Sequence, residues 1–319
     1  MMLSVIIPTY NRKGLIKYTL DSLDKQHHPE VDFEIIVVDD GSDDGTYEYV
    51  INNYPNVTLV KNIQKGAPSA RNAGVSIAKG KYIMYLDSDD LVGPRFFKQK
   101  ISFLEQNPGI QACYGEYDFF ESDNDFRSEY IIYKIKYPII QSTESGLRHL
   151  SNYLSGYYLP PNAIIWRKEF VDSIGGYDES LSINQDVELF IRAILNGLKI
   201  VPVIDDTKVY IRSHTLDKRV GSTGDSDKKY LEILELRKRI ISEMKMKNIN
   251  DALCLQSLSH YLFNFWIDLR KSKPEIAAQF LSLAQKTYWP IQLKGGIFLR
   301  LLSQIVGPVN AIKIKGMMR

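Results

Sequence analysis

The chain has 319 residues, enough for one large α/β domain with an appendage or for two modest domains. Its 40 Lys and Arg stand against 38 Asp and Glu, and the formal net charge of +2 excludes a global field that would attract nucleic acid. Apolar residues make up 44% of the sequence, so the chain can bury a full core.

The cysteines and the apolar stretches limit where the protein can work. Cys113 and Cys254 show the spacing of neither a zinc site nor a disulfide framework, which predicts two buried thiols in a reducing compartment. No apolar stretch reaches the roughly 18 residues that a membrane span needs, and the amino terminus lacks the pattern of a signal peptide. We therefore expect a cytoplasmic protein without an integral membrane segment.

Apolar, β-branched runs predict five strands, most of them suited to a sheet that is buried on both faces. They cover residues 3–7, 33–38, 57–60, 83–86 and 111–114. After the first strand, Ile16, Leu20 and Leu23 fall on one face of a helix that Asn11 or a neighbour would cap.

A second helix fits between Gly66 and Lys79, with Pro68 in the first turn, where the missing amide costs nothing. Its expected stripe of small and apolar residues consists of Ala70, Ala73, Ile77 and Ala78. Strands that alternate with helices predict an α/β fold with a Rossmann-like, mainly parallel twisted sheet and helices on both sides.

Polar clusters follow three of the predicted strands. Pro8, Thr9 and Tyr10 end the first, Asp39 and Asp40 end the second, and residues 87–90 end the fourth. Ligands of such sheets bind at the carboxyl ends of the strands, so one nucleotide site explains all three clusters. Otherwise each cluster is an independent turn.

The densest cluster is Asp87-Ser88-Asp89-Asp90, with three carboxylates in four positions. Carboxylates this close repel one another, and a divalent cation whose other ligands are phosphate oxygens would relieve the repulsion. A solvated acidic turn is the alternative. The glycine-rich signatures of a dinucleotide-binding domain and of a Walker P-loop are both absent, so metal and side chains would have to hold the phosphates.

Five short stretches, in this order, resemble the inverting nucleotide-sugar glycosyltransferases of family two, which have the GT-A fold. They are Ser4-Val5-Ile6-Ile7-Pro8-Thr9-Tyr10-Asn11, Ile36-Val37-Val38-Asp39-Asp40-Gly41-Ser42, Ala70-Arg71-Asn72-Ala73-Gly74, Tyr85-Leu86-Asp87-Ser88-Asp89-Asp90 and Gly176-Tyr177-Asp178-Glu179. The resemblance covers roughly the first two thirds of the chain.

The resemblance implies a role for each matching residue on the donor side. Tyr10 would stack on the nucleobase, Asp40 would accept a hydrogen bond from it, and Arg71 would lie near the nucleotide. A carboxylate suits the N–H of uracil, which implies a UDP-sugar. Substrate-binding positions also fall on Pro8, Thr9, Asp87 and Ser88, with Asp87 near the ribose.

Metal binding is implied for Asp89, with Mn²⁺ or Mg²⁺ as the cofactor, while Asp90 would support its neighbours or cap a helix. His214, in Tyr210-Ile211-Arg212-Ser213-His214, corresponds to a residue that completes the metal and diphosphate shell, and a structural histidine is the alternative. The loop of residues 215–226 would be a lid over the donor or a plain linker.

Transfer also needs a base for the acceptor hydroxyl. The family uses the Asp of a Glu-Asp pair at the start of a helix, and here residues 184–192 place Asp186 there, with Gly197 near the helix end. Gln185 departs from the family's glutamate. A helix amino-terminal aspartate stabilised by the helix dipole is the alternative for Asp186.

The segment of residues 142–177 would form the acceptor side, because its aromatic residues suit sugar rings, although they equally suit a core. Its aromatic residues are Tyr153, Tyr157, Tyr158 and Trp166. Residues 226–319 read as helices, in which Leu255, Leu258, Leu262, Phe265 and Leu269 share a face and Pro274 opens a further helix. Their basic, apolar last part would contact a membrane surface or a second subunit.

The sequence thus predicts a catalytic domain over residues 1–225, with a nucleotide-sugar half (1–115) and an acceptor and base half (116–225), followed by a helical region (226–319). The expected reaction is metal-dependent transfer, with inversion, from a UDP-sugar to a saccharide or lipid-linked saccharide at the cytoplasmic face of the inner membrane. A catalytically silent nucleotide-sugar-binding protein, which Gln185 favours, and a sugar-phosphate nucleotidyltransferase, whose glycine-rich signature is missing, are the alternatives.

Overall fold

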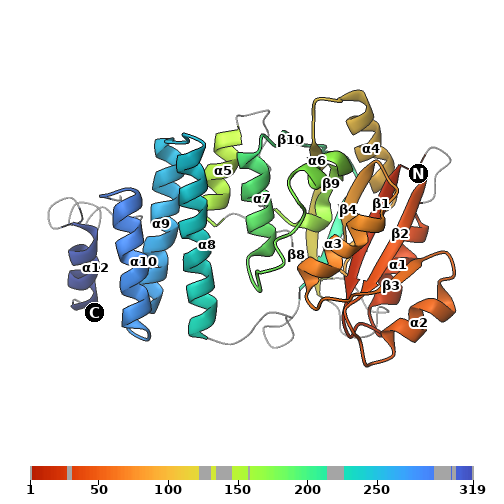
Figure 1. The fold of residues 1–319 in the computed structure, drawn as a ribbon, viewed down its shortest axis with the longest axis horizontal. Helices are drawn as coiled ribbons and strands as arrows, with labels where there is room; N and C mark the ends of the chain where they lie inside the picture. The colour runs from red at the N-terminus through yellow and green to blue at the C-terminus, as the bar shows by residue number, and fades with distance from the viewer. Residues whose placement is uncertain are drawn as a thin grey trace. The chain divides into compact units, whose positions relative to one another are not determined.

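The computed structural model describes residues 2–26, 31–121, 131–133, 146–156, 159–213, 226–290, 303 and 307–317. The chain divides into two compact units (Figure 1). The first comprises Met1–Gly146 and Tyr158–Gly224, and the second comprises Leu147–Tyr157 and Asp225–Arg319. The predicted boundary after residue 225 assigns Leu147–Tyr157 to the catalytic part of the chain. In the structure this segment clusters with the later helices.

The first unit is built on a seven-stranded sheet of order β10-β6-β9-β4-β1-β2-β3. Its strands are β1 (Leu3–Thr9), β2 (Phe33–Asp39), β3 (Thr58–Lys61), β4 (Tyr82–Tyr85), β6 (Ala112–Tyr114), β9 (Ile164–Arg167) and β10 (Ile200–Pro202). Only β9 runs antiparallel to its neighbours, β4 and β6. The mainly parallel α/β sheet is therefore confirmed, and all five predicted strands are present.

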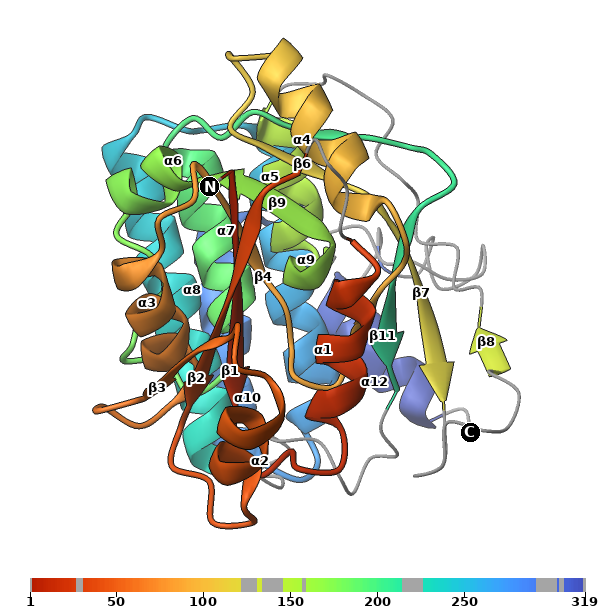
Figure 2. The ribbon, with the colours of Figure 1, turned by 90° about the vertical axis from the view of Figure 1, so that its right-hand side faces the viewer.

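Helices cover both faces of this sheet (Figure 2). They are α1 (Ile16–Asp24), α2 (Thr46–Asn53), α3 (Ala67–Ile77), α4 (Phe96–Gln106), α6 (Lys168–Ser173) and α7 (Gln185–Leu195). Side chains alternate along β1, so Leu3, Val5 and Ile7 join α1 and α4 in one core while Ile6 faces α3. Both sets are fully buried, which is why the strand reads as a continuous apolar run.

A second, four-stranded sheet of order β5-β11-β7-β8 was not predicted. It consists of β5 (Leu91–Val92), β7 (Glu116–Glu121), β8 (Ile131–Tyr133) and β11 (Lys208–Arg212). Because β11 pairs with β5, which follows the acidic run directly, this small sheet brings Arg212 to the carboxyl end of β4.

The second unit is helical. It contains α5 (Gly146–Leu154), α8 (Asp227–Met246), α9 (Ala252–Leu269), α10 (Pro274–Thr287) and α12 (Pro308–Met317). Leu258, Leu262 and Leu269 of the predicted stripe are buried, and Phe265 stacks on Phe280 of α10 at 4.8 Å between ring centroids. No helix in the described part of the chain is long and apolar enough to cross a membrane.

Some local expectations were wrong. Asn11 does not cap α1, which begins after Leu15 without a side-chain cap. Asn11 instead lies in the preceding turn, with a φ of 52°. In α3, Ile77 is 40% exposed, whereas Gly74 faces the sheet and Val75 is buried. For Trp166 and Tyr153, where the sequence left a sugar-binding face and a core open, the 1% exposure of each favours the core. Tyr157 and Tyr158 lie outside the described residues.

Candidate functional site

The ends of β1 and β2 are joined by a lattice of hydrogen bonds. The Asp40 amide donates to the Thr9 carbonyl at 2.8 Å, and the Asn11 amide donates to the Ser42 hydroxyl at 2.9 Å. Asn11 Oδ1 accepts in turn from the Asp43 amide at 2.9 Å. The first two polar clusters of the sequence are thus one structure. Asn11 makes its two hydrogen bonds with the Ser42–Asp43 turn in a backbone conformation of positive φ.

Tyr10 and Asp40, the predicted contacts of the nucleobase, lie at this edge. The Tyr10 ring follows the half-buried Pro8 and the buried Thr9 and is 44% exposed, as a stacking surface must be. The Asp40 carboxylate accepts from the Gly66 amide at 3.0 Å and from Asn62 Nδ2 at 2.7 Å. Asn62, which sequence reasoning missed, therefore fixes the carboxylate that is expected to read the base.

Each carboxylate of the acidic run after β4 has at least one cationic or amide partner. Arg71 Nη2 lies 3.0 Å from Asp87 Oδ1, and Arg12 Nε lies 3.3 Å from Asp89 Oδ2. Asp90, 2% exposed, accepts from the Arg212 amide at 2.8 Å. Asp90 supports its neighbours instead of capping a helix, and Ser88 between them is buried.

Asn162 connects two of these carboxylates. It follows Pro161 in a 3₁₀ turn, η1 (Pro161–Ala163), and is 3% exposed. Its Nδ2 donates to Asp87 Oδ2 at 3.3 Å and to Asp90 Oδ2, and its Oδ1 accepts from the Asp87 amide at 3.3 Å. Sequence reasoning missed this role, as it missed the Arg12 ion pair, because both partners come from distant segments.

The electrostatics of the run favour an added cation. Burial raises the pKa of Asp87 against the pull of Arg71, and the charges of Asp89 and Asp186 raise it further. Burial, Asp89 and Asp87 likewise raise the pKa of Asp90 well above its usual range. A divalent cation beside Asp89 would relieve this repulsion. Within the described residues, no three His, Cys, Asp or Glu side chains form a metal cluster.

Helix α7, which Arg71 also contacts, begins with Gln185 and carries Asp186 in its first turn. Asp186 is half-buried, and its Oδ1 accepts from the Tyr177 hydroxyl at 2.9 Å. Arg71 Nη1 lies 3.4 Å from Gln185 Oε1. The buried guanidinium therefore contacts both the donor-side carboxylate Asp87 and the start of the helix that holds the candidate base.

Two sequence motifs meet through Asn72. Its Nδ2 donates to the Tyr177 carbonyl at 2.9 Å, and its Oδ1 accepts from the Tyr177 amide at 2.8 Å. Gly176 has a φ of +64°, and a Cβ there would lie 2.5 Å from Asn72 Oδ1, so only glycine fits. Arg192 Nη2 donates to the Gly176 carbonyl at 2.6 Å, which ties α7 to the same turn.

The structure thus brings together Arg71, Asp87 and Asp186, and places Asp89 next to Asp87 in the same run. Tyr10 and Asp40 lie at the neighbouring ends of β1 and β2. His214 and residues 215–225 lie outside the described residues, so the metal role of His214 and the lid stay predictions. A cavity of about 340 Å³, lined by Lys79, Arg167 and Asp172 among others, lies at the opposite ends of the strands, away from these residues.

Comparison with known proteins places this geometry among the sugar transferases. Residues 4–169 match the family Glycosyl transferase family 2. An uncharacterized glycosyltransferase of Haemophilus influenzae is 29% identical over 290 residues, which are 88% of this chain and 94% of that protein. The poly(ribitol-phosphate) beta-N-acetylglucosaminyltransferase TarS of Staphylococcus aureus is 25% identical over 82% of this chain, which spans 44% of TarS.

A crystal structure of S. aureus TarS residues 1–349 in complex with UDP-GlcNAc shares the fold, with a TM-score of 0.69 and 21% identity. The match covers 98% of this chain and 89% of that one. The GT-A-like architecture, with its helical carboxy-terminal region, is therefore confirmed.

Proposed function

The chain belongs to glycosyl transferase family 2, and on that premise we propose that it transfers a sugar from a UDP-sugar to a saccharide acceptor with inversion at the anomeric carbon. The observation that carries the proposal is Arg71, which pairs with Asp87 at 3.0 Å and also contacts Gln185 and Tyr177 beside Asp186. One buried guanidinium therefore pairs with the donor-side carboxylate Asp87 and interacts electrostatically with the candidate base Asp186.

Uracil recognition is proposed for Tyr10 and Asp40. The exposed Tyr10 ring offers a stacking face, and Asp40 is a fixed acceptor for an N–H, which uracil has at the position where cytosine has none. The TarS structure in complex with UDP-GlcNAc supports a donor of this class. Pro8, Thr9 and Ser88 would line the nucleotide, and Asp87 would approach the ribose.

Asp89, with His214 as a second ligand, would hold Mn²⁺ or Mg²⁺. When bound, the cation supplies positive charge to the diphosphate that leaves. Of the chain's own groups, Arg12 lies 3.3 Å from Asp89, and Arg71 lies 3.0 Å from Asp87, so two guanidinium groups at the acidic run would also attract a diphosphate.

Asp186 would accept the proton of the acceptor hydroxyl as that oxygen attacks the anomeric carbon. It is half-buried and lies in the first turn of α7. A positioned general base contributes on the order of 10² to 10⁴ in rate. Asp186→Asn should therefore lose at least that range in turnover and keep its affinity for UDP.

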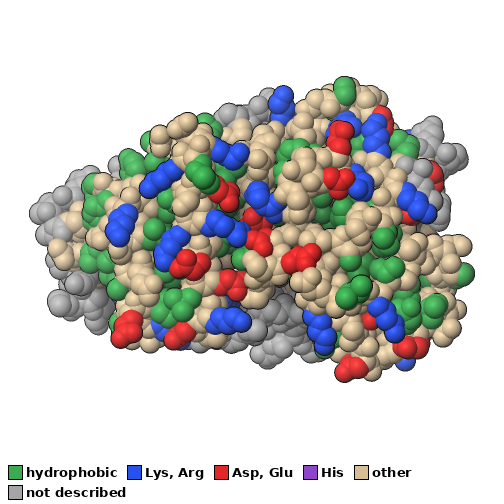
Figure 3. All heavy atoms as spheres, viewed as in Figure 1, with side chains coloured by type: hydrophobic (Ala, Val, Ile, Leu, Met, Phe, Trp, Pro, Cys, Tyr) green, Lys and Arg blue, Asp and Glu red, His purple; other side chains and the backbone are tan. Residues whose placement is uncertain are grey.

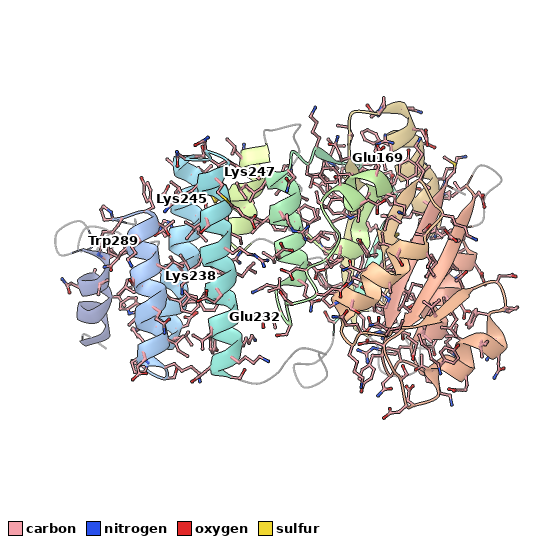
Figure 4. The ribbon with its side chains drawn as sticks, in the orientation of Figure 1. Glu169, Glu232, Lys238, Lys245, Lys247 and Trp289 are labelled. Carbon is pink, nitrogen blue, oxygen red and sulfur yellow. The ribbon has the colours of Figure 1, made fainter. Side chains whose placement is uncertain are left out.

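An acceptor on a membrane lipid is proposed from the charge of the second unit. Leu147–Tyr157 and Asp225–Arg319 hold 17 Lys and Arg against 8 Asp and Glu, whereas the whole chain has a net charge of +2. Lys and Arg side chains gather over α8 in Figure 3, and Figure 4 shows Lys238 and Lys245 on this helix and Lys247 just past its end. Such a surface attracts anionic lipid headgroups at the cytoplasmic face of a membrane.

The test of the donor site is calorimetric binding of UDP, GDP, CDP and TDP, with and without Mn²⁺, to the wild type and to Asp89→Asn. Tight binding of UDP that needs both Mn²⁺ and Asp89 is expected. If no nucleotide binds under any metal condition, the acidic strand ends are turns and the proposal is withdrawn. Nucleotide binding without turnover of any UDP-sugar would favour a silent binding protein, the alternative that Gln185 suggests.

A further inference from the structure

The hydroxyl of Tyr177 donates a hydrogen bond to the candidate base, Asp186. It lies 2.9 Å from Asp186 Oδ1. The terminal torsion of an aspartate side chain is broad and nearly two-fold, so its own rotamer preference does not fix where the carboxylate oxygens point. A hydrogen bond from a rigid donor does fix them.

Tyr177 is such a donor, because its backbone and its ring are both held. Asn72 pairs with the amide and carbonyl of Tyr177 at 2.8 and 2.9 Å. The Arg71 guanidinium lies over the ring at 5.0 Å from its centroid, and Tyr85 meets it edge-on, also at 5.0 Å. The whole residue is 2% exposed.

The protonation state of Tyr177 agrees with donation. Burial and the charge of Asp186 raise the pKa of Tyr177 well above its ordinary value, although Arg71 acts in the other direction. The phenol therefore stays protonated at neutral pH, and its O–H is available to the carboxylate.

We propose that Tyr177 is a positioning residue for the transfer reaction: its hydroxyl orients Asp186, and the Arg71 guanidinium, stacked on its ring and paired with Asp87, links that orientation to the donor side of the site. The inference rests on the proposed function, since it needs Asp186 to be the base. It assigns a role to the tyrosine of the Gly-Tyr-Asp-Glu stretch that a phenylalanine could not fill.

The experiment is a double-mutant cycle of Tyr177→Phe and Asp186→Asn, with turnover of a UDP-sugar and the UDP dissociation constant measured for each variant. Tyr177→Phe should lower kcat on the order of 10-fold to 100-fold and change the UDP dissociation constant by less than about 2-fold. In the Asp186→Asn background the same change should cause no further loss, because the hydroxyl acts through that carboxylate. 4-Aminophenylalanine at position 177, which retains a donor, should restore most of the turnover.

Tyr85→Phe is the matched control. It removes a hydroxyl from the ring next to Tyr177, and this hydroxyl is buried without a hydrogen-bond partner in the described structure, so turnover should not change. Equal losses from Tyr177→Phe in both backgrounds, or none in the wild type, would overturn the positioning role while Asp186→Asn still reports on the base. If Asp186→Asn turned over at the wild-type rate, both the assignment of Asp186 as the base and the role of Tyr177 would be overturned.

Discussion

Gly74→Ala tests how closely α3 must approach β1 for the site to form. A Cβ at Gly74 would lie 2.3 Å from Ile6 Cγ2 and 3.3 Å from Val38 Cγ2. Carbon atoms in contact are normally about 3.5–4.0 Å apart, so α3 would have to move by roughly an ångström away from the sheet. Ile6 is fully buried on its strand, which leaves it little room to yield.

Two stability effects oppose each other in this variant. Alanine in place of glycine within a helix is favourable by about 0.5–1 kcal/mol, whereas overpacking a core costs about 1–3 kcal/mol. The net loss in the free energy of unfolding should therefore be no more than about 2.5 kcal/mol. The protein should still fold.

Gly74→Ala should reduce turnover by a larger factor than it reduces the stability of the fold. Helix α3 carries Arg71 and Asn72, whose contacts with Asp87 and Tyr177 measure between 2.8 and 3.0 Å and would break on such a shift. A displacement of 1 Å can cost on the order of 10² in rate. Gly109→Ala is the control, because a Cβ there meets nothing within 4 Å.

The assay is UDP-sugar turnover together with urea unfolding followed by circular dichroism. We expect Gly74→Ala to lose about 100-fold in turnover while both variants stay folded in buffer. Wild-type turnover and stability in Gly74→Ala would refute the close packing of α3 on β1 as the basis of the site.

Further predictions concern the polar contacts that hold the unit. Asn162→Ala should lower the free energy of unfolding by about 2–4 kcal/mol, because it leaves the buried Asp90 and the half-buried Asp87 with one donor fewer, and should weaken UDP binding in the same calorimetric assay; an unchanged urea midpoint would contradict this. Lys100 is fully buried and lies 2.7 Å from Asp205, so Asp205→Asn should cost about 3–5 kcal/mol, whereas Lys100→Met, which removes the charge and keeps the volume, should cost far less. Equal losses would argue against this asymmetry. Burial works to raise the pKa of Asp205, but hydrogen bonds from Lys100 and Thr207 outweigh it and hold that pKa below its usual value. Because the folded pKa lies below the unfolded one, this contribution is present above about pH 4 and is lost as the pH falls through the folded pKa. Acid unfolding of Lys100→Met should therefore depend less steeply on pH in that window, and identical profiles would contradict the pairing.

The strands and their polar ends could be predicted because the signals are local. Residues 3–7 are apolar without interruption, and the strand they predict is buried on both faces as β1. The start of α7 at Gln185, with Asp186 in its first turn, could also be located from the helical pattern and Gly197, whose φ is +86°. Parallel topology then brings the strand ends to one edge without any further information.

Long-range partners could not be predicted in this way. Trp166 belongs to β9, which inserts antiparallel between β4 and β6, and no local periodicity reveals such a pairing. Asn162 lies more than 70 residues from the carboxylates it connects. Arg12 and Asn62 are residue types that are common in loops, so the sequence does not mark them. Only the fold shows that each binds an acidic side chain of the site.

The most direct test of the account is the rate of UDP release from a panel of UDP-sugars, with a panel of saccharides and water as acceptors, in the wild type and in Asp186→Asn. We expect acceptor-dependent turnover by the wild type, a loss of at least about 10² in Asp186→Asn, and equal UDP affinity in both. Equal turnover in the two proteins would contradict the assignment of Asp186 as the base.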